Sequence, residues 1–375
     1  MRKNVLILGH NDATQFIDIY NQYTRLFDPK HYAVTVVYLT GKEDPVSRER
    51  TLAEEVIFLE IPKKAVRGFK INAIQHLLKL TRAKKFDIVI CHRYKPIYIM
   101  MWIARLQFIP VSIYVMHELK TMASLGRRLL ANALWRDNMY FAGVSNAVRD
   151  DLRRSLPRIP SDHILTLYNV IDTELTEPHL LSREEARRAL QLPQDAFVFG
   201  NIGRLVRNKD QASLLQAFTI IKPYCPGAKL MIMGIGELEA ELKQQITANG
   251  LTDDVILTGF IPNAVNYIRA FDNFVLCSTQ EAFGRVLIEA MLAQCPIIAT
   301  TVNGIPEVMG DTGILIKPKD PVALAQVMQA MFKMSEAERA AIADKAYRHV
   351  HAHYSIPAFR EQFWQLPLLK TVSFT

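Results

Sequence analysis

The feature that most constrains the fold is a regular alternation of short apolar runs with helix-length amphipathic segments along all 375 residues. The apolar runs are rich in β-branched residues and continuously apolar, which is typical of parallel strands covered by helices on both faces. We predict a first series of strands at 5–9, 33–39, 56–61, 87–91, 111–116, 140–144 and 164–167. A second series follows at 197–203, 229–233, 255–257, 273–277, 296–299 and 313–316. This repeated strand–helix order predicts two doubly wound α/β domains.

The apolar pattern lapses between the two series, so we place a linker at residues 169–181. The predicted domains are residues 1–170 and 182–354. Ser182 and Glu185 have the spacing of a capping box, which predicts a helix start there. A final helix at 355–365 carries Phe359, Phe363 and Trp364 on one side.

Composition excludes several classes of protein. No apolar run approaches the roughly 18 residues that a membrane-spanning helix needs. The four cysteines are far apart and form no C-x-x-C pair, so neither a disulfide framework nor a zinc site is indicated. We therefore expect a cytoplasmic protein, because the cytoplasm keeps thiols reduced.

The charge is concentrated in the first half of the chain. Residues 1–172 hold 26 Lys and Arg against 16 Asp and Glu, whereas residues 173–375 hold 19 against 21. The segment 63–85 has eight basic residues and no acid, with Ile71, Ile74, Leu77 and Leu78 at helical spacing. Such a helix is typical of a peripheral contact with an anionic membrane, and equally of a solvated face of an α/β domain. Nucleic acid is not indicated, because no stacking pattern or helix-turn-helix signature accompanies the charge.

A basic loop at 203–209 follows a predicted strand and precedes a helix whose predicted core residues are Leu214, Leu215, Phe218 and Ile221. Gly200 and Gly203 would let the backbone approach a ligand, and Arg204, Lys209 and Arg207 would supply positive charge. The pattern favours a phosphate site; an ordinary basic loop is the alternative.

A second candidate anion site lies where Gly284 joins a strand to a helix. The residues expected to form the buried face of this helix are Val286, Leu287, Ala290 and Met291. We expect the amides of 284–287 to be unpaired and to face an anion. Glu281 and Glu289 could each accept hydrogen bonds from sugar hydroxyls, so the constellation predicts a sugar nucleotide as ligand.

The spacing of Glu281 and Glu289 is the E-x7-E spacing of retaining glycosyltransferases. Further motifs are G-R-L-x-x-x-K at 203–209, glycines at 234, 236 and 259, and N-G-I-P-E-V at 303–308. Together they resemble glycosyltransferase family 4 over most of residues 195–310. The resemblance implies a GT-B fold, with two Rossmann-like domains facing across a cleft and the segment 355–375 crossing back to the first domain.

The resemblance also implies roles for individual residues. It places the donor diphosphate on Arg204, Lys209 and the 284–287 amides, the ribose on Glu289, the transferred sugar on Glu281 and the nucleobase beside Ile261. The implied catalytic residues are Arg204, Lys209, Glu281 and His117. The implied donor-binding residues are Gly203, Ile261, Phe283, Gly284, Arg285, Val286, Leu287 and Glu289.

The first domain resembles the family less closely. His117, which follows the strand 111–116, matches a strand-end histidine that lies beside the donor sugar in the family, with Glu118 orienting it or the acceptor. A histidine at a strand end can also be a hydrogen-bonded loop residue. The first loop, 9–12, has one glycine where many members carry a pair.

The resulting hypothesis is a retaining, metal-independent glycosyltransferase that moves a sugar from a nucleotide donor, with a UDP-sugar favoured, to a glycan or glycolipid. No metal is expected because the sequence has no D-x-D motif. A bacterial lipopolysaccharide or envelope polysaccharide would be the product. A GT-B epimerase, a phosphorylase or a non-catalytic sugar-nucleotide-binding subunit remain alternatives, whereas the first loop lacks the G-x-G-x-x-G of a nicotinamide dehydrogenase.

Overall fold

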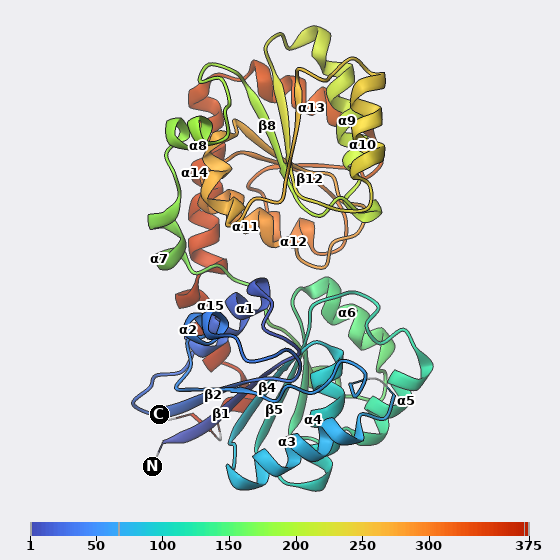
Figure 1. Ribbon diagram of the computed structural model, residues 1–375, viewed down its shortest axis with the longest axis vertical. Helices are drawn as coiled ribbons and strands as arrows, with labels where there is room; N and C mark the ends of the chain where they lie inside the picture. The colour runs from blue at the N-terminus through green and yellow to red at the C-terminus, as the bar shows by residue number, and fades with distance from the viewer. Residues whose placement is uncertain (1, 67, 371, 374–375) are drawn as a thin grey trace. The chain divides into compact units, whose positions relative to one another are not determined.

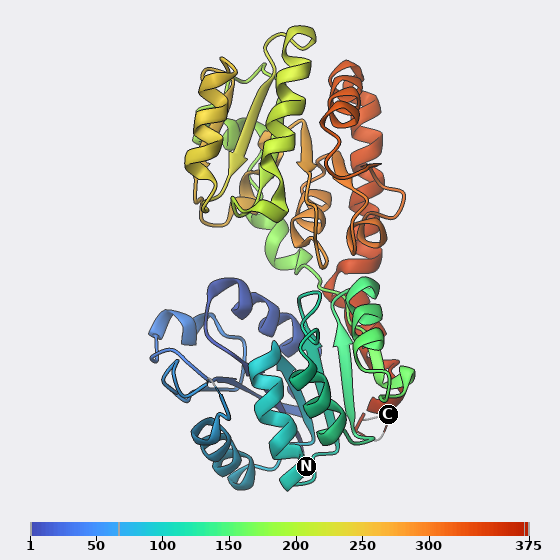
Figure 2. The same cartoon turned by 90° about the vertical axis from the view of Figure 1, so that its right-hand side faces the viewer.

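The computed structural model describes residues 2–66, 68–370, 372 and 373. The chain forms two compact units, one made of the residues up to Asn169 together with those from Ile356 onward, the other of Val170–Ser355 (Figure 1). Each unit contains one parallel sheet with helices on both faces (Figure 2). The two-domain α/β prediction is confirmed, and each of the thirteen predicted strands overlaps a strand of the structure.

The first unit has a seven-stranded sheet of order β3-β2-β1-β4-β5-β6-β7, in which all pairings are parallel. Its strands are β1 (Lys3–Gly9), β2 (Tyr32–Tyr38), β3 (Glu55–Phe58), β4 (Ile88–His92), β5 (Val111–Met116), β6 (Met139–Gly143) and β7 (Ile164–Thr166). Its helices are α1 (Thr14–Thr24), α2 (Pro45–Arg50), α3 (Ile71–Ala83), α4 (Tyr94–Leu106), α5 (Leu125–Leu134), α6 (Asn146–Ser155), η1 (Ser161–His163), α15 (Ile356–Trp364) and η6 (Pro367–Leu369). The direction of winding reverses between β1 and β4, which creates a crevice at their carboxyl ends.

The second unit has a six-stranded parallel sheet of order β10-β9-β8-β11-β12-β13. Its strands are β8 (Val198–Ile202), β9 (Lys229–Met233), β10 (Val255–Gly259), β11 (Asn273–Leu276), β12 (Ile297–Thr300) and β13 (Ile314–Ile316). Its helices are α7 (Thr173–Thr176), η2 (Glu177–His179), α8 (Arg183–Ala189), η3 (Arg207–Lys209), α9 (Gln211–Ile221), η4 (Lys222–Tyr224), α10 (Glu239–Ala248), η5 (Ala264–Ala270), α11 (Arg285–Leu292), α12 (Ile305–Met309), α13 (Pro321–Lys333) and α14 (Glu336–Tyr354). Here the winding reverses between β8 and β11.

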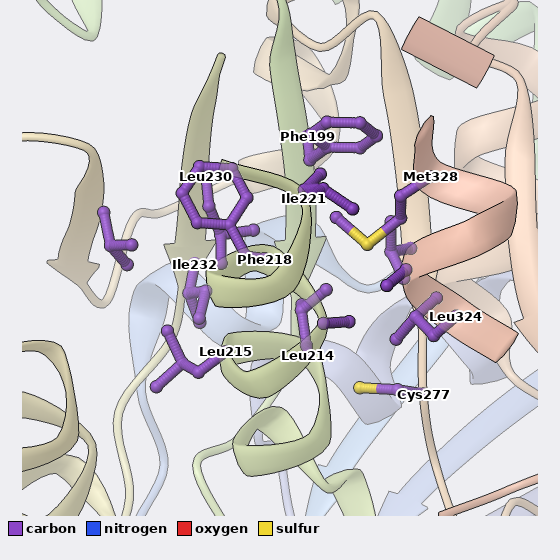
Figure 3. Close-up of a cluster of buried hydrophobic side chains, with 14 of the residues drawn as sticks. Phe199, Leu214, Leu215, Phe218, Ile221, Leu230, Ile232, Cys277, Leu324 and Met328 are labelled. Carbon is purple, nitrogen blue, oxygen red and sulfur yellow. The ribbon is translucent and has the colours of Figure 1, made fainter. Parts of the chain in front are cut away.

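The core of the second unit forms where α9 and α13 pack over the sheet (Figure 3). Phe199 of β8, Phe218 of α9 and Met328 of α13 are fully buried in it. The predicted core residues of α9 are all buried, namely Leu214, Leu215, Phe218 and Ile221. The loop between β8 and α9 is therefore anchored at both of its ends, because both elements have residues in this core.

A capping box begins α8, and a buried arginine attaches this helix to the residues before β11. The predicted capping box is present, because the Ser182 hydroxyl accepts the Glu185 amide and the Glu185 carboxylate accepts the Ser182 amide. One turn later, Arg187 is fully buried and donates to the Asp272 carboxylate at 2.7 Å and to the Ala270 carbonyl at 2.9 Å. A buried guanidinium requires such partners, because an unpaired buried charge is costly.

The helix α15 belongs to the first unit, as the resemblance implied. Phe359 and Phe363 are buried edge-on against Tyr23 and Phe27, with ring centroids 5.2 and 5.7 Å apart. The Trp364 indole donates to the Leu26 carbonyl at 2.9 Å. The aromatic side predicted for 355–365 is thus buried against α1 and the residues that follow it.

Two further predictions concern membranes. In the described ranges, no helix is both long enough and apolar enough to span a bilayer. The basic segment does form a helix, α3, but its buried residues are Ala73, Leu77 and Thr81. Of the four apolar residues at helical spacing, Leu77 is buried, whereas Ile71 at the first position of α3 is 62% exposed.

Candidate functional site

The loops after β8 and β11 meet at the carboxyl edge of the second sheet, where its winding reverses. The Lys209 ammonium contacts the Glu281 carboxylate, and both side chains are only 16% exposed. The Ser278 hydroxyl donates to the same carboxylate oxygen at 3.3 Å, and the Thr279 amide donates to the Asn208 carbonyl at 2.9 Å. Two residues that are 72 positions apart thus form one charged group at the edge where doubly wound sheets bind ligands.

Glycines hold the loop containing Arg204 in place. The Gly203 amide donates to the Met233 carbonyl at 3.0 Å, and the Gly234 amide donates to the Gly259 carbonyl at 2.8 Å. A Cβ at Gly234 would lie 1.9 Å from the Gly203 carbonyl oxygen, so only glycine fits there. Arg204 itself is exposed, and its backbone carbonyl accepts a hydrogen bond from the side-chain amide of Gln211 at 3.1 Å.

The expected role of Gly200 is wrong. A Cβ at Gly200 would lie 2.0 Å from the Phe271 ring, so this glycine makes room for a core side chain and not for a ligand. Gly203 is different, since the nearest atoms to a Cβ there are 3.9 Å away. The predicted helix follows the loop, since α9 begins at Gln211, and the 3₁₀ turn η3 forms the last three residues of the loop.

The junction at Gly284 has the predicted form. Gly284 is the N-cap of α11 with φ of +86°, a conformation that favours glycine. The prediction of four unpaired amides is wrong at Leu287, whose amide donates to the Gly284 carbonyl at 2.8 Å. The amides of Gly284 and Val286 have no acceptor among the described residues. They leave the positive end of the helix available to an anion.

The side chains of this segment differ in accessibility. Leu287 is buried as predicted, but Val286 is only half-buried and Ile288 is buried in its place. The Phe283 ring is also buried, edge-on to Tyr354 at 5.6 Å, so only its main chain could face a ligand.

The two acids of the predicted site, Glu289 and Glu281, make contacts with nearby residues. Glu289 lies one turn into α11 and is 3.9 Å from the Arg285 guanidinium, with about a fifth of its side chain exposed. The Glu281 amide donates to the Asn303 side chain at 3.3 Å, and the Gly304 amide donates to the Glu281 carbonyl at 3.2 Å. Ile261 is half-buried just after β10.

In the first unit, His117 follows β5 and is half-buried, and its Nε2 lies 3.1 Å from Nδ1 of His92. His92, the last residue of β4, is fully buried. Burial and the neighbouring imidazole hold the pKa of His92 well below its ordinary value, so this ring stays neutral. Glu118, the residue after His117, is exposed. His92 was not among the residues predicted for the site. The sequence marks it only as a polar residue at the end of an apolar strand.

The first loop is shaped by an aromatic residue. A Cβ at Gly9 would lie 2.6 Å from the Tyr20 ring, so the ring leaves no room for a side chain at this position. His10 follows, and its carbonyl accepts the Thr40 amide at 3.0 Å. Burial and the positive charges of Lys95, Arg93 and Lys63 lower the pKa of His10 to about 4.

The described residues contain no group of three or more His, Cys, Asp and Glu side chains placed to hold a metal ion. The four cysteines are buried and free.

Two family models match the chain. "Glycosyl transferases group 1" matches residues 182–349, and "Glycosyltransferase Family 4" matches residues 22–175. The chain belongs to glycosyltransferase family 4. The first match contains Arg204, Lys209, Glu281 and Glu289, and the second contains His117.

Several curated relatives of this family 4 chain act on cell-envelope glycans by name. The capsular polysaccharide biosynthesis glycosyltransferase CapM of Staphylococcus aureus is 29% identical over 171 residues, which are 44% of each chain. The lipopolysaccharide core biosynthesis glycosyltransferase LpsD of Rhizobium meliloti is 33% identical over 148 residues, 39% of this chain and 42% of the relative. The matched parts thus span less than half of the length of these relatives.

Solved structures share the whole fold. A glycosyltransferase from Rickettsia africae matches with a TM-score of 0.83 and 15% identity over 100% of both chains. Anabaena Alr3699/HepE, crystallised with UDP, matches with a TM-score of 0.75 and 20% identity over 97% of this chain and 98% of the other. At these identities the likeness establishes the GT-B fold of this family 4 chain.

Proposed function

We propose that this chain transfers a sugar from a nucleoside diphosphate sugar to a hydroxyl group of a glycan or glycolipid, in the synthesis of a bacterial envelope polysaccharide. The observation that carries the proposal is the Lys209–Glu281 pair beside the N-terminus of α11. Cations and a helix N-terminus suit a diphosphate, and carboxylates suit the hydroxyls of a sugar. The names of the relatives favour transfer over epimerisation, phosphorolysis or a non-catalytic role.

The chemistry follows from where charge develops. The bond between the anomeric carbon and the diphosphate oxygen breaks while the acceptor oxygen bonds to that carbon. Negative charge then grows on the diphosphate, where Arg204, Lys209 and the Gly284 and Val286 amides would stabilise it. We assign the acceptor proton to a leaving phosphate oxygen on the same face, which gives retention of configuration. With this positive charge supplied by the chain, we propose that no metal is needed.

We assign Glu289 to the ribose, Glu281 to the transferred sugar, the main chain near Ile261 to the base and His117 to the donor sugar. A UDP-sugar is the donor we favour, since HepE was crystallised with UDP and UDP-glucose.

Thermal-shift measurements with UDP-, GDP-, ADP- and dTDP-sugars, each with and without EDTA, test the donor site. We expect one nucleotide series to stabilise the wild type, with no effect of EDTA, and Glu289→Ala to lose the shift. Glu241→Ala, which changes an exposed glutamate on α10, is the matched control. Equal shifts in wild type and Glu289→Ala would contradict the assignment.

We also propose that the protein works in the cytoplasm and contacts the inner membrane face through residues 63–85. Phe69 is 80% exposed and Ile71 is 62% exposed, beside the exposed Lys63 and Lys64. Exposed apolar side chains flanked by lysines are typical of peripheral membrane contacts. We expect Phe69→Ser with Ile71→Ser to weaken binding to anionic liposomes; unchanged binding would contradict this contact.

A further inference from the structure

A pocket of about 520 Å³ lies in the first unit, at the carboxyl ends of β1, β4 and β5. Its lining includes five cations and a single carboxylate, Glu118. The cations are Lys70, Arg93, Lys95, Lys120 and Arg127. They come from four separate segments of the chain, so the fold collects this charge in one place. The volume is within the range of small-molecule sites.

Three of these cations rest on aromatic rings. The Arg93 guanidinium lies 4.6 Å from the centre of the Phe16 ring, and that of Arg127 lies 4.2 Å from the centre of the Tyr94 ring. The Lys70 ammonium lies 3.8 Å from the centre of the Tyr98 ring. The ring faces attract and position the cations.

The same three cations have no ion-pair partner among the residues that the structure describes. Arg127 donates to the Thr121 carbonyl at 2.7 Å and Lys70 to the Gly68 carbonyl at 2.8 Å, which neutralises neither. By contrast Lys84, at the end of α3, pairs with Glu55 at 2.7 Å. The charge of these three cations is thus left for a ligand to neutralise.

The backbone is held in an unfavourable conformation at three of the pocket's cations. Lys70, Arg93 and Lys120 have φ of +55°, +71° and +59°. Residues other than glycine rarely adopt positive φ, and those that do cluster at functional sites. Tertiary bonds maintain the strain, since the Lys120 amide donates to the Asp151 carboxylate at 2.7 Å and the Arg93 amide to the Val115 carbonyl at 3.1 Å.

We propose that this pocket binds a phosphate or diphosphate ester carried by the acceptor. The inference rests on the proposed function, which supplies the acceptor, and names the chemical class of that acceptor. Two guanidinium groups bind phosphate oxygens bidentately, and the ring-anchored ammonium adds charge without a fixed direction. The volume exceeds that of one phosphate group, so it also accommodates an attached sugar or a second phosphate.

Isothermal titration calorimetry with inorganic pyrophosphate tests the site in the full chain. We expect Lys70→Gln with Arg127→Gln to weaken one class of pyrophosphate binding at least tenfold and to leave UDP binding unchanged. Lys79→Gln, which removes an exposed charge on α3, is the matched control and should bind as the wild type does. Arg127→Lys should restore part of the affinity, which separates lost charge from lost folding. Identical titrations for the wild type and the double variant would overturn the proposal.

Competition distinguishes the two sources of such a phosphate. Displacement of pyrophosphate from the Lys70- and Arg127-dependent site by glucose 1-phosphate supports a phosphorylated sugar, and displacement by farnesyl diphosphate supports a lipid diphosphate. Displacement by neither overturns the proposal. If no nucleotide sugar binds while pyrophosphate binding still depends on Lys70 and Arg127, the proposed function fails and the site stands. If nucleotide sugars bind while the double variant titrates normally, the site fails and the proposed function stands.

Discussion

Replacing Lys209 by methionine separates catalysis from structure in the second unit. The substitution keeps most of the side-chain volume but removes the ammonium that contacts Glu281, a carboxylate only 16% exposed. Glu281 then retains the Ser278 hydroxyl at 3.3 Å. A poorly satisfied charge of this kind costs about 1–3 kcal/mol. With about 2–4 °C lost per kcal/mol, the melting temperature should fall by several degrees. If Lys209 also stabilises the leaving diphosphate, the transfer rate should fall by about 10²–10³.

The double variant Lys209→Met with Glu281→Gln distinguishes the two contributions. Replacing both partners of a pair is often nearly neutral for stability, so its melting temperature should return toward that of the wild type. The transfer rate should stay low, because neither the cation nor the carboxylate is regained. The assay is release of nucleotide diphosphate in the presence of acceptor, with the melting temperature recorded for the same preparations. A double variant that regains wild-type activity would refute the reasoning, because the pair would then be structural only.

Three further outcomes are expected. Arg187→Met should destabilise the second unit by about 1–3 kcal/mol in urea unfolding, since the buried Ala270 and Ala196 carbonyls lose their donor and Asp272 keeps only Arg183 as an ion-pair partner among the described residues, whereas the exposed Arg188→Met should change stability little. Gly234→Ala should abolish the nucleotide-dependent thermal shift, because its Cβ would lie 1.9 Å from a carbonyl oxygen of the Arg204 loop; a normal shift would show that this loop does not bind the donor. The free energy of unfolding should decrease as the pH falls below about 6.5. The His92 imidazole binds a proton in the unfolded chain at that pH, whereas the buried imidazole of the folded chain stays neutral. His92→Gln should reduce that dependence and leave the part that comes from His10 and His349, whose pKa values are also lowered; an unaltered slope would exclude His92 as a source.

The strands and the second-unit site could be predicted from the sequence because their signals are local. Continuous apolar runs of four to seven residues mark buried parallel strands wherever they occur. The closeness of Lys209 and Glu281 could be anticipated because each residue lies in the loop that follows a strand, and the carboxyl ends of adjacent parallel strands share one edge. Position at a strand end is therefore enough to bring distant residues together.

Glycine and histidine roles were less predictable, because they depend on what lies opposite. Gly200 and Gly234 look alike in sequence, yet one faces the Phe271 ring and the other faces the Gly203 carbonyl. His92 continues an apolar strand, and only the neighbouring loop places His117 against it. The amide of Leu287 could not be foreseen either, since a single 2.8 Å bond to Gly284 decides whether it is available.

The uneven distribution of charge between the two halves of the chain shows what composition can predict about a binding site and what it cannot. Residues 63–85 carry the densest run of basic residues, but only one cation of the first-unit pocket comes from that run. The others come from the start of α4, the loop before α5 and the first turn of α5. Lys84, which belongs to the run, is neutralised by Glu55, while Lys70 is held over the Tyr98 ring. Net charge therefore indicates that the first unit meets an anion, but the positions of acids and rings determine where. If the anion were a membrane surface alone, no reason would exist to hold three cations at positive φ around one pocket, and this strain is what favours a discrete phosphate ligand.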